Sequence, residues 1–220
     1  AGLSPTRWQA DSFPAVFRPR ISVIHDGVDT EAVAPNPAGR VMLNGEVALT
    51  RDSEVVTFVA RDLEPYRGFH CFMRALPSIL RLRPKARVLI VGGSGVSYGA
   101  APPAGESWRE VFVREVRERI GDAEWSRVHF LGRLPYAHYL AVLQCASVHV
   151  YLTYPFVLSW SLLEAMSVGA SIVASDTPPV REVIEDDETG RLVGFFDHQR
   201  LAETVAALLD AKGERQRLGA

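Results

Sequence analysis

The chain has 220 residues, of which 47% are hydrophobic and 23% are charged, so it can bury one good-sized core. Its formal net charge of -2 argues against a general nucleic-acid binder, and any phosphate must then be bound by a few placed cations. The cysteines, Cys71 and Cys145, suggest neither a disulfide framework nor a metal cluster, and no apolar run approaches the roughly eighteen residues of a membrane span. We therefore expect a cytoplasmic protein.

The chain begins with a segment that differs in pattern from the rest. Residues 1–20 carry aromatic side chains and three prolines, and they are predicted to form a short helix and a linker from an interdomain region. The start resembles neither a signal peptide nor a native beginning, and the end lacks a cap, so we expect an excised domain. Residues 21–220 are predicted to form that domain, with a strand at 21–24, a turn at 25–29 and an irregular stretch at 30–53.

Apolar runs then alternate with helical patterns. Strands are expected at residues 55–60, 87–92, 128–132, 148–152, 171–175 and 192–193. Helices are expected from 69, where Pro77 should kink or shorten the helix, and at 107–120, 136–146, 159–168, 178–184 and 199–211. This alternation predicts an α/β fold with a doubly wound, mainly parallel sheet of about six strands, which is a Rossmann-like arrangement.

The stretch from Tyr154 to Gly169 is predicted to connect a strand to a helix at the carboxyl edge of this sheet. Ser159 and Ser161 are acceptable N-caps for that helix. Ligands bind at this edge of open α/β sheets, where free N–H groups and the helix dipole attract an anion. Glu164, about one turn into the helix, suits a vicinal diol such as a ribose, and a solvated helix residue is the open alternative.

Two arginines follow the strand at 55–60 and can reach the same edge. Arg61 and Arg67 would clamp a diphosphate, and Gly68 would let the backbone come close. The alternative is that both are surface arginines paired with the adjacent Asp62 or Glu64.

Two further loops leave strand ends. The glycine-rich segment 92–99 lacks a Gly-x-Gly-x-x-Gly pattern at a helix start, which disfavours a nicotinamide-dinucleotide site, although its backbone could contact a nucleotide or sugar. The segment 132–135 could read a base edge, or could be a plain turn. The histidines show no ligand spacing, and His129 and His149 are expected to be satisfied core residues. We therefore predict no metal site.

The order of several motifs resembles the C-terminal, donor-binding domain of a retaining glycosyltransferase of family 4, which is one half of the GT-B architecture. The segment 25–29 also resembles the family's first segment after the interdomain linker. The motifs are Arg61-x5-Arg67-Gly68, Val91-Gly92-Gly93, Phe130-Leu131-Gly132-Arg133-Leu134, Leu162-Leu163-Glu164-Ala165-Met166-Ser167-x-Gly169, and Glu182-Val183-Ile184 with Thr189-Gly190-Arg191-Leu192-Val193.

The resemblance implies a role for each matching residue. Arg61 and Arg67 would be catalytic by holding the diphosphate and stabilising the leaving group, although lysine is usual at the second position. Glu164 would bind the ribose. The other residues implied in nucleotide binding are Gly93, Leu131, Arg133, Leu134, Ser159, Ser161 and Leu162.

The main departure from the family pattern is Phe156. It stands where the Glu-x7-Glu motif has its first glutamate, the contact to the donor sugar. A phenyl ring cannot accept hydrogen bonds from sugar hydroxyls, so either the sugar is held differently or the domain is inactive. Ser159 likewise replaces a usual glycine.

The resemblance thus implies a hexosyltransferase-type enzyme that uses a nucleoside-diphosphate sugar, without metal or other cofactor, in polysaccharide or glycolipid biosynthesis. The acceptor domain would precede this one in the same chain, and membrane association of the longer protein is an option. This fragment alone should catalyse little. The alternatives are a non-catalytic nucleotide-binding or regulatory module of the same fold, and an unrelated doubly wound dehydrogenase.

Overall fold

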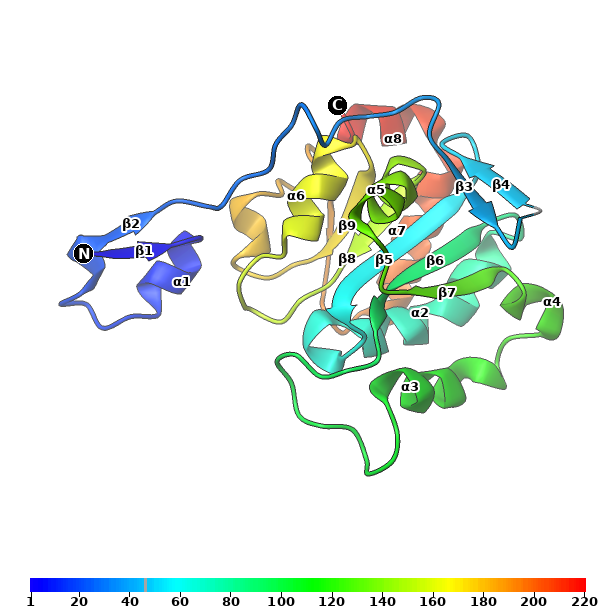
Figure 1. The fold of residues 1–220 in the computed structure, drawn as a ribbon, viewed down its shortest axis with the longest axis horizontal. Coiled ribbons are helices and arrows are strands. Elements are labelled where there is room, and N and C mark those ends of the chain that lie inside the picture. Colours follow the sequence, from blue (N-terminus) through cyan, green and yellow to red (C-terminus); the bar gives the residue numbers. More distant parts are fainter. Residues whose placement is uncertain (46) are drawn as a thin grey trace.

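The computed structural model describes residues 1–45 and 47–220, and its centre is one six-stranded sheet (Figure 1). All its strands are parallel, in the order β10-β9-β8-β5-β6-β7, which confirms the predicted Rossmann-like sheet. The strands are Val55–Asp62 (β5), Arg87–Gly93 (β6), Val128–Gly132 (β7), Val148–Tyr151 (β8), Ser171–Ser175 (β9) and Arg191–Val193 (β10).

Helices cover both faces of the sheet, because the central strands are apolar on both sides. One core lies under four helices, Phe69–Leu82 (α2), Trp108–Arg117 (α3), His198–Asp210 (α7) and Lys212–Leu218 (α8). The opposite core lies under Tyr136–Gln144 (α5) and Trp160–Ser167 (α6), and the short helix Asp122–Trp125 (α4) leads into β7. Helix α2 continues through Pro77 without being shortened, since its buried face packs along the sheet and α7.

Two connections differ from the prediction. The stretch at 30–53, expected to be irregular, contains an antiparallel hairpin, Arg40–Leu43 (β3) and Val47–Thr50 (β4), which buries Leu43 and Leu49 against β5 and β6. Asn44 and Gly45 in its turn have φ of 50° and 75°, and Asn-Gly between apolar runs is the sequence signal that would have predicted this hairpin. The helix predicted at 178–184 is wrong. Only a 3₁₀ turn, Val180–Glu182 (η3), forms there, because the backbone leaves helical geometry at Val183, whose φ is -127°, before the chain turns into β10.

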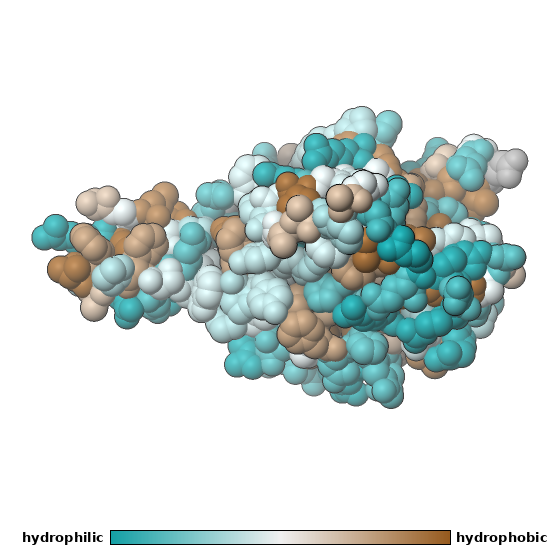
Figure 2. All heavy atoms as spheres, turned by 90° about the horizontal axis from the view of Figure 1, so that it is seen from below, coloured by the Kyte–Doolittle hydropathy of each residue, from teal (hydrophilic) through white to brown (hydrophobic). Residues whose placement is uncertain are grey.

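The N-terminal residues form a small unit that projects from the domain (Figure 1). The strand predicted at 21–24 exists as Ile21–Val23 (β2), but it pairs with Gly2–Ser4 (β1) and not with the main sheet. A short helix, Arg7–Asp11 (α1), lies between them, and its first N–H groups donate to the Glu182 carboxylate at 2.7 Å. Figure 2 shows apolar side chains gathered on this unit, where Leu3, Phe13, Val16, Phe17 and Ile24 are exposed.

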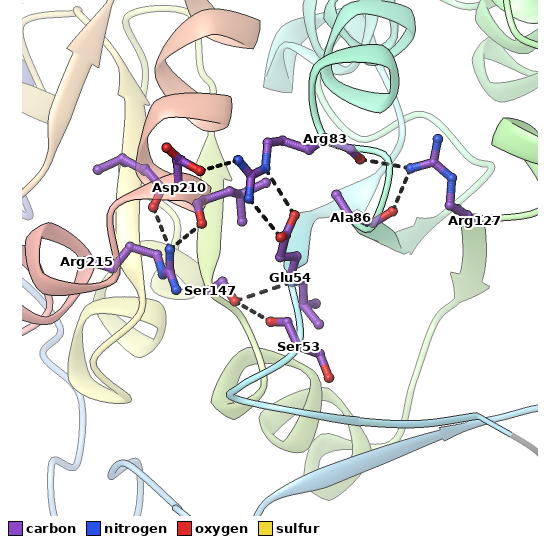
Figure 3. Close-up of polar contacts among 11 residues, drawn as sticks. Ser53, Glu54, Arg83, Ala86, Arg127, Ser147, Asp210 and Arg215 are labelled. Atoms are coloured by element: carbon purple, nitrogen blue, oxygen red, sulfur yellow. Dashed lines mark hydrogen bonds and ion pairs between the residues drawn. The ribbon is translucent and has the colours of Figure 1, made fainter.

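Charged side chains form a network of hydrogen bonds and ion pairs at the edge of the sheet where the strands begin, which is its amino edge (Figure 3). The Arg83 guanidinium donates to Glu54, just before β5, at 2.8 and 3.1 Å, and to Asp210, at the end of α7, at 2.7 Å. Arg127, just before β7, donates to the carbonyls of Arg83 and Ala86 at 3.0 and 3.1 Å. Both arginines are therefore engaged in structural contacts at this edge.

Two buried histidines are neutral in the fold. His149 in β8 has Nδ1 2.9 Å from Thr57 Oγ1, but Nε2 has no partner among the described residues, so the expected satisfied histidine is only half satisfied. Burial lowers the pKa of His149 to about 3. Burial, assisted by the nearby Arg74, lowers the pKa of His70 to about 4.

These histidines should make the fold acid-sensitive. Below pH of about 6.5 the unfolded chain binds protons that the folded chain does not, so the stability present above that pH should fall by about 1.4 kcal/mol per pH unit for each histidine. Urea unfolding from pH 7.5 to pH 5 measures this slope. His149→Gln should reduce this slope by about 1.4 kcal/mol per pH unit and leave the contribution of His70, and the exposed His138→Gln is the control. An unchanged slope in His149→Gln would contradict the conclusion that His149 is neutral in the folded protein.

Candidate functional site

The candidate site lies at the point in the sheet where the order in which the chain adds strands reverses. From β5 the chain runs outward to β6 and β7, then crosses back to β8 on the other side of β5. The loops after β5 and β8 therefore diverge and leave a crevice at the carboxyl edge, the usual ligand position in such sheets.

Two cavities open at this crevice and share Ala60 and Arg61. The first, of about 260 Å³, is called the arginine cavity, and its lining includes Asp26, Arg61, Arg67, Tyr98, Tyr151, Ser159 and Trp160. The second, of about 530 Å³, is called the Tyr139 cavity, and it is lined by Ala60, Arg61, Val91, Gly92, Arg133, Leu134 and Tyr139.

Arg67 is the buried cation of the arginine cavity, with 8% of its surface exposed. Its Nη1 donates to Thr153 Oγ1 and to the Val157 carbonyl, both at 3.0 Å, and these acceptors are neutral. The guanidinium carbon lies 5.2 Å from the ring centroids of both Tyr98 and Phe156. No carboxylate forms an ion pair with it within residues 1–45 and 47–220. An arginine buried without a counter-charge is suited to an anionic ligand.

The neighbouring carboxylates are engaged elsewhere. Asp62 accepts from Ser97 Oγ at 2.6 Å, Arg133 Nη2 at 2.8 Å and the Gly95 N–H at 3.1 Å. Burial would raise the pKa of Asp62, but these hydrogen bonds outweigh it and keep the pKa below its ordinary value. Glu64, fully buried, accepts from N–H groups of residues 97–99.

Arg61 is an exposed cation that lines both cavities. It belongs to the end of β5, and its guanidinium carbon lies 6.0 Å from the Tyr98 ring centroid. Among the described residues it takes part in no ion pair, so neither Arg61 nor Arg67 is paired with Asp62 or Glu64. The surface-pair alternative raised by the sequence does not apply in this structure.

The start of α6 faces the arginine cavity. Ser159 is the N-cap residue, but its Oγ lies 3.0 Å from Ser161 Oγ and caps no N–H group, and its own N–H donates to Tyr151 Oη at 2.8 Å. The Leu162 N–H donates to the Ser159 carbonyl at 3.1 Å, and the Leu162 side chain lies in the core. The N–H groups of Trp160 and Ser161 remain without a partner among the described residues, so they are the donors available to an anion.

Glu164 is buried between two tyrosines of α5. Tyr136 donates to Glu164 Oε1 at 3.0 Å and Tyr139 donates to Oε2. Burial, and then the hydrogen bond to Glu164, raises the pKa of Tyr139 and of Tyr136. Tyr139 lines the Tyr139 cavity and Tyr136 is 56% exposed, whereas Glu164 lines neither cavity. Both oxygens of the Glu164 carboxylate are thus engaged by phenols.

The remaining predicted residues divide into two groups. Gly93 lies against Asp62, where a Cβ would stand 2.4 Å from Oδ1, and Arg133 and Leu134 line the Tyr139 cavity. Leu131 instead packs in the core beside the hairpin. Phe156 packs against Tyr66 and Tyr98, with ring centroids 5.3 and 5.0 Å away, and it does not line the arginine cavity.

Sequence reasoning missed the aromatic part of the site, and Asp26. Tyr136 and Tyr139 are three residues apart on one helix, a spacing that places them on the same face. Tyr151 ends a strand at the ligand edge, where its hydroxyl lies 3.5 Å from Arg67 Nη1. Asp26 accepts from Trp160 Nε1 at 2.8 Å, and no local pattern announces that contact.

A parallel sheet with these two cavities at its switch point is the architecture of the Rossmann-like domains of GT-B glycosyltransferases. Residues 45–220 match the model of the family described as glycosyl transferases group 1, and the chain belongs to this family. Residues 1–33 match a second model, described as glycosyl transferase family 4 group.

Among curated relatives, the D-inositol 3-phosphate glycosyltransferase of Corynebacterium efficiens is 29% identical over 203 residues, 91% of this chain and 45% of the relative. The phosphatidyl-myo-inositol mannosyltransferase of Mycolicibacterium smegmatis is 29% identical over 191 residues, 85% of this chain and 42% of the relative. The chain thus spans somewhat less than half the length of these relatives.

Solved structures show the same fold. A sucrose-phosphate synthase from Thermosynechococcus elongatus superposes with a TM-score of 0.74 at 24% identity, covering 99% of this chain and 51% of that one. Anabaena Alr3699/HepE, solved in complex with UDP and glucose, also superposes with a TM-score of 0.74, at 17% identity, and the match covers 99% of this chain and 55% of that one.

The described residues contain no group of three or more histidine, cysteine, aspartate or glutamate side chains placed to hold a metal ion. No helix among them has the length and apolar character needed to span a bilayer. The metal-free reaction stays a prediction.

Proposed function

We propose that this chain is the donor-binding domain of a retaining glycosyltransferase that takes its sugar from a nucleoside-diphosphate sugar. The observation that carries this proposal is Arg67, a buried guanidinium at the switch point that contacts neutral oxygens and aromatic rings but no carboxylate of the described chain. A diphosphate supplies the missing negative charge. The UDP and glucose bound to the structurally similar Anabaena protein support this ligand class.

The two cavities suggest how the donor lies. The nucleoside occupies the Tyr139 cavity, where Leu134 packs on the base and Glu164, behind Tyr139, receives the ribose hydroxyls. The diphosphate lies at the junction, between Arg61 and Arg67, and the sugar lies in the arginine cavity.

The chemistry is then electrostatic. As the glycosidic bond breaks, negative charge develops on the departing diphosphate. Arg61, Arg67 and the two free N–H groups at the start of α6 stabilise that charge, and no metal ion is needed for this step. The acceptor is bound by a second domain of the longer protein, so this chain by itself binds the donor and transfers little. We place the protein in the cytoplasm, in polysaccharide or glycolipid synthesis.

A second candidate is a non-catalytic nucleotide-binding or regulatory module. Phe156 favours it, because the position expected to contact the donor sugar carries a phenyl ring that packs on Tyr66 and Tyr98. Sugar transfer by the longer protein, measured as release of nucleoside diphosphate with added acceptors, separates the two. Binding without any transfer or donor hydrolysis would favour the module.

Calorimetric titration of this chain with UDP, GDP and ADP tests the site. We expect one of them to bind, and Glu164→Ala to weaken it by about ten-fold or more, because a hydrogen bond to a charged group contributes about 1.5 kcal/mol or more. The exposed Glu203→Ala on α7 is the matched control and should bind as the wild type does. Equal affinity in Glu164→Ala would remove Glu164 from the ribose site.

A further inference from the structure

The glycine-rich loop after β6 is held in one place by the two carboxylates that precede Arg67. Asp62 binds Gly95 and Ser97, and Glu64 accepts from the N–H groups of Ser97 at 3.2 Å, Tyr98 at 3.2 Å and Gly99 at 3.1 Å. Both carboxylates are buried. The loop is therefore anchored on both sides of Tyr98, which has little freedom to move its backbone.

This anchoring presents the Tyr98 ring to the arginine cavity. Tyr98 is 40% exposed and lines that cavity, and its ring centroid lies 6.0 Å from the guanidinium carbon of Arg61 and 5.2 Å from that of Arg67. Its hydroxyl makes no hydrogen bond within the part of the chain that the structure describes. The ring is the common neighbour of the two cations proposed to hold the diphosphate.

The position of Tyr98 defines which end of the donor it meets. The Tyr139 cavity shares Arg61 with the arginine cavity but includes neither Arg67 nor Tyr98. A nucleoside placed there leaves the diphosphate between the two arginines and directs its terminal phosphate toward Tyr98. The group attached to that phosphate is the sugar.

We propose that Tyr98 is a specificity-determining residue that contacts the donor sugar, in a role that Phe156 cannot fill. One face of a sugar ring carries C–H groups, which pack on an aromatic ring, and the free phenol can bond a sugar hydroxyl. Phe156 packs behind Tyr98, with ring centroids 5.0 Å apart, and supports it. This inference rests on the proposed function, because it requires a nucleotide sugar in the site.

The test compares each nucleoside diphosphate with its sugar conjugate. UDP and UDP-glucose, GDP and GDP-mannose, and ADP and ADP-glucose are titrated into the wild type, and the pair whose nucleotide binds is carried forward. Tyr98→Ala should weaken binding of the sugar conjugate by about ten-fold and binding of the free nucleoside diphosphate by less than about two-fold. Tyr98→Phe should retain most of the affinity for the conjugate. Val96→Ala, an exposed residue of the same loop that does not line the cavity, is the matched control.

The outcomes separate this inference from the proposed function. If Tyr98→Ala weakens both ligands equally, the ring only organises the arginines and the inference is overturned. If it weakens neither, Tyr98 does not contact the donor, which also overturns it. If the wild type binds no nucleotide of the three pairs, the proposed function itself fails on this chain, and the inference with it.

Discussion

Replacing Arg67 by alanine should weaken binding of the nucleoside diphosphate by about ten-fold to a hundred-fold. Each charge-assisted hydrogen bond contributes about 1.5–3 kcal/mol, and an arginine residue that is only 8% exposed loses little of this to solvent screening. The measurement is calorimetric titration of the variant beside the wild type. Sugar transfer by the longer protein should fall at least as far, because in the proposed mechanism the same charge stabilises the leaving group.

Arg67 also holds the loop after β8 through Thr153 and Val157, so the variant needs a check of its folding. Thermal unfolding provides it, and Arg67→Lys, which keeps the charge, should recover part of the affinity. Arg61→Ala should also weaken binding of the nucleoside diphosphate, by about ten-fold. Its effect should be smaller than that of Arg67→Ala, because Arg61 is exposed. Arg81→Ala, an exposed arginine on α2, is the control. Unchanged affinity in both Arg61→Ala and Arg67→Ala would remove the diphosphate from this site.

The outline of the fold was readable because buried parallel strands appear as continuous apolar runs. Val55–Asp62 and Arg87–Gly93 show this pattern, and the helices between strands show the complementary periodicity. The helix predicted at 178–184 was wrong because prolines followed by apolar residues are typical both of a helix start and of a single 3₁₀ turn. There the backbone leaves helical geometry at Val183 and turns into β10, which pairs with β9, and that pairing is not a local property of the segment.

The sequence named several residues that the fold brings together at the candidate site, and the electrostatics of that site show why its other residues were not named. From sequence, Arg67 could equally pair with Glu64, three residues away. The fold turns the Glu64 carboxylate toward N–H groups at 97–99, more than thirty residues later in the chain, and this contact also places Tyr98. A loop's position depends on such distant partners, so the aromatic wall of the arginine cavity could be found only in the structure.

Both the fold and the candidate site require that residue 68 has no Cβ atom. Gly68→Ala should therefore lower the free energy of unfolding by about 2–5 kcal/mol. Its φ of 71° is left-handed, which costs a residue with a Cβ about 1–2 kcal/mol. A Cβ there would also stand 2.3 Å from Leu152 Cβ and 3.2 Å from Phe195, and such overpacking costs about 1–3 kcal/mol more. Urea denaturation of the variant and the wild type gives the difference in free energy of unfolding.

Gly132→Ala is the matched control for Gly68→Ala. Gly132 has a φ of 66°, but a Cβ there meets no atom within 4 Å, so this variant carries the backbone cost without the steric one. Equal destabilisation of the two variants would show that the close approach to Leu152 is not what requires glycine. The expected excess in Gly68→Ala has a functional consequence as well. Gly68 separates Arg67 from α2, so any shift that relieves the contact moves the guanidinium away from the arginine cavity and should weaken diphosphate binding in the fraction that remains folded.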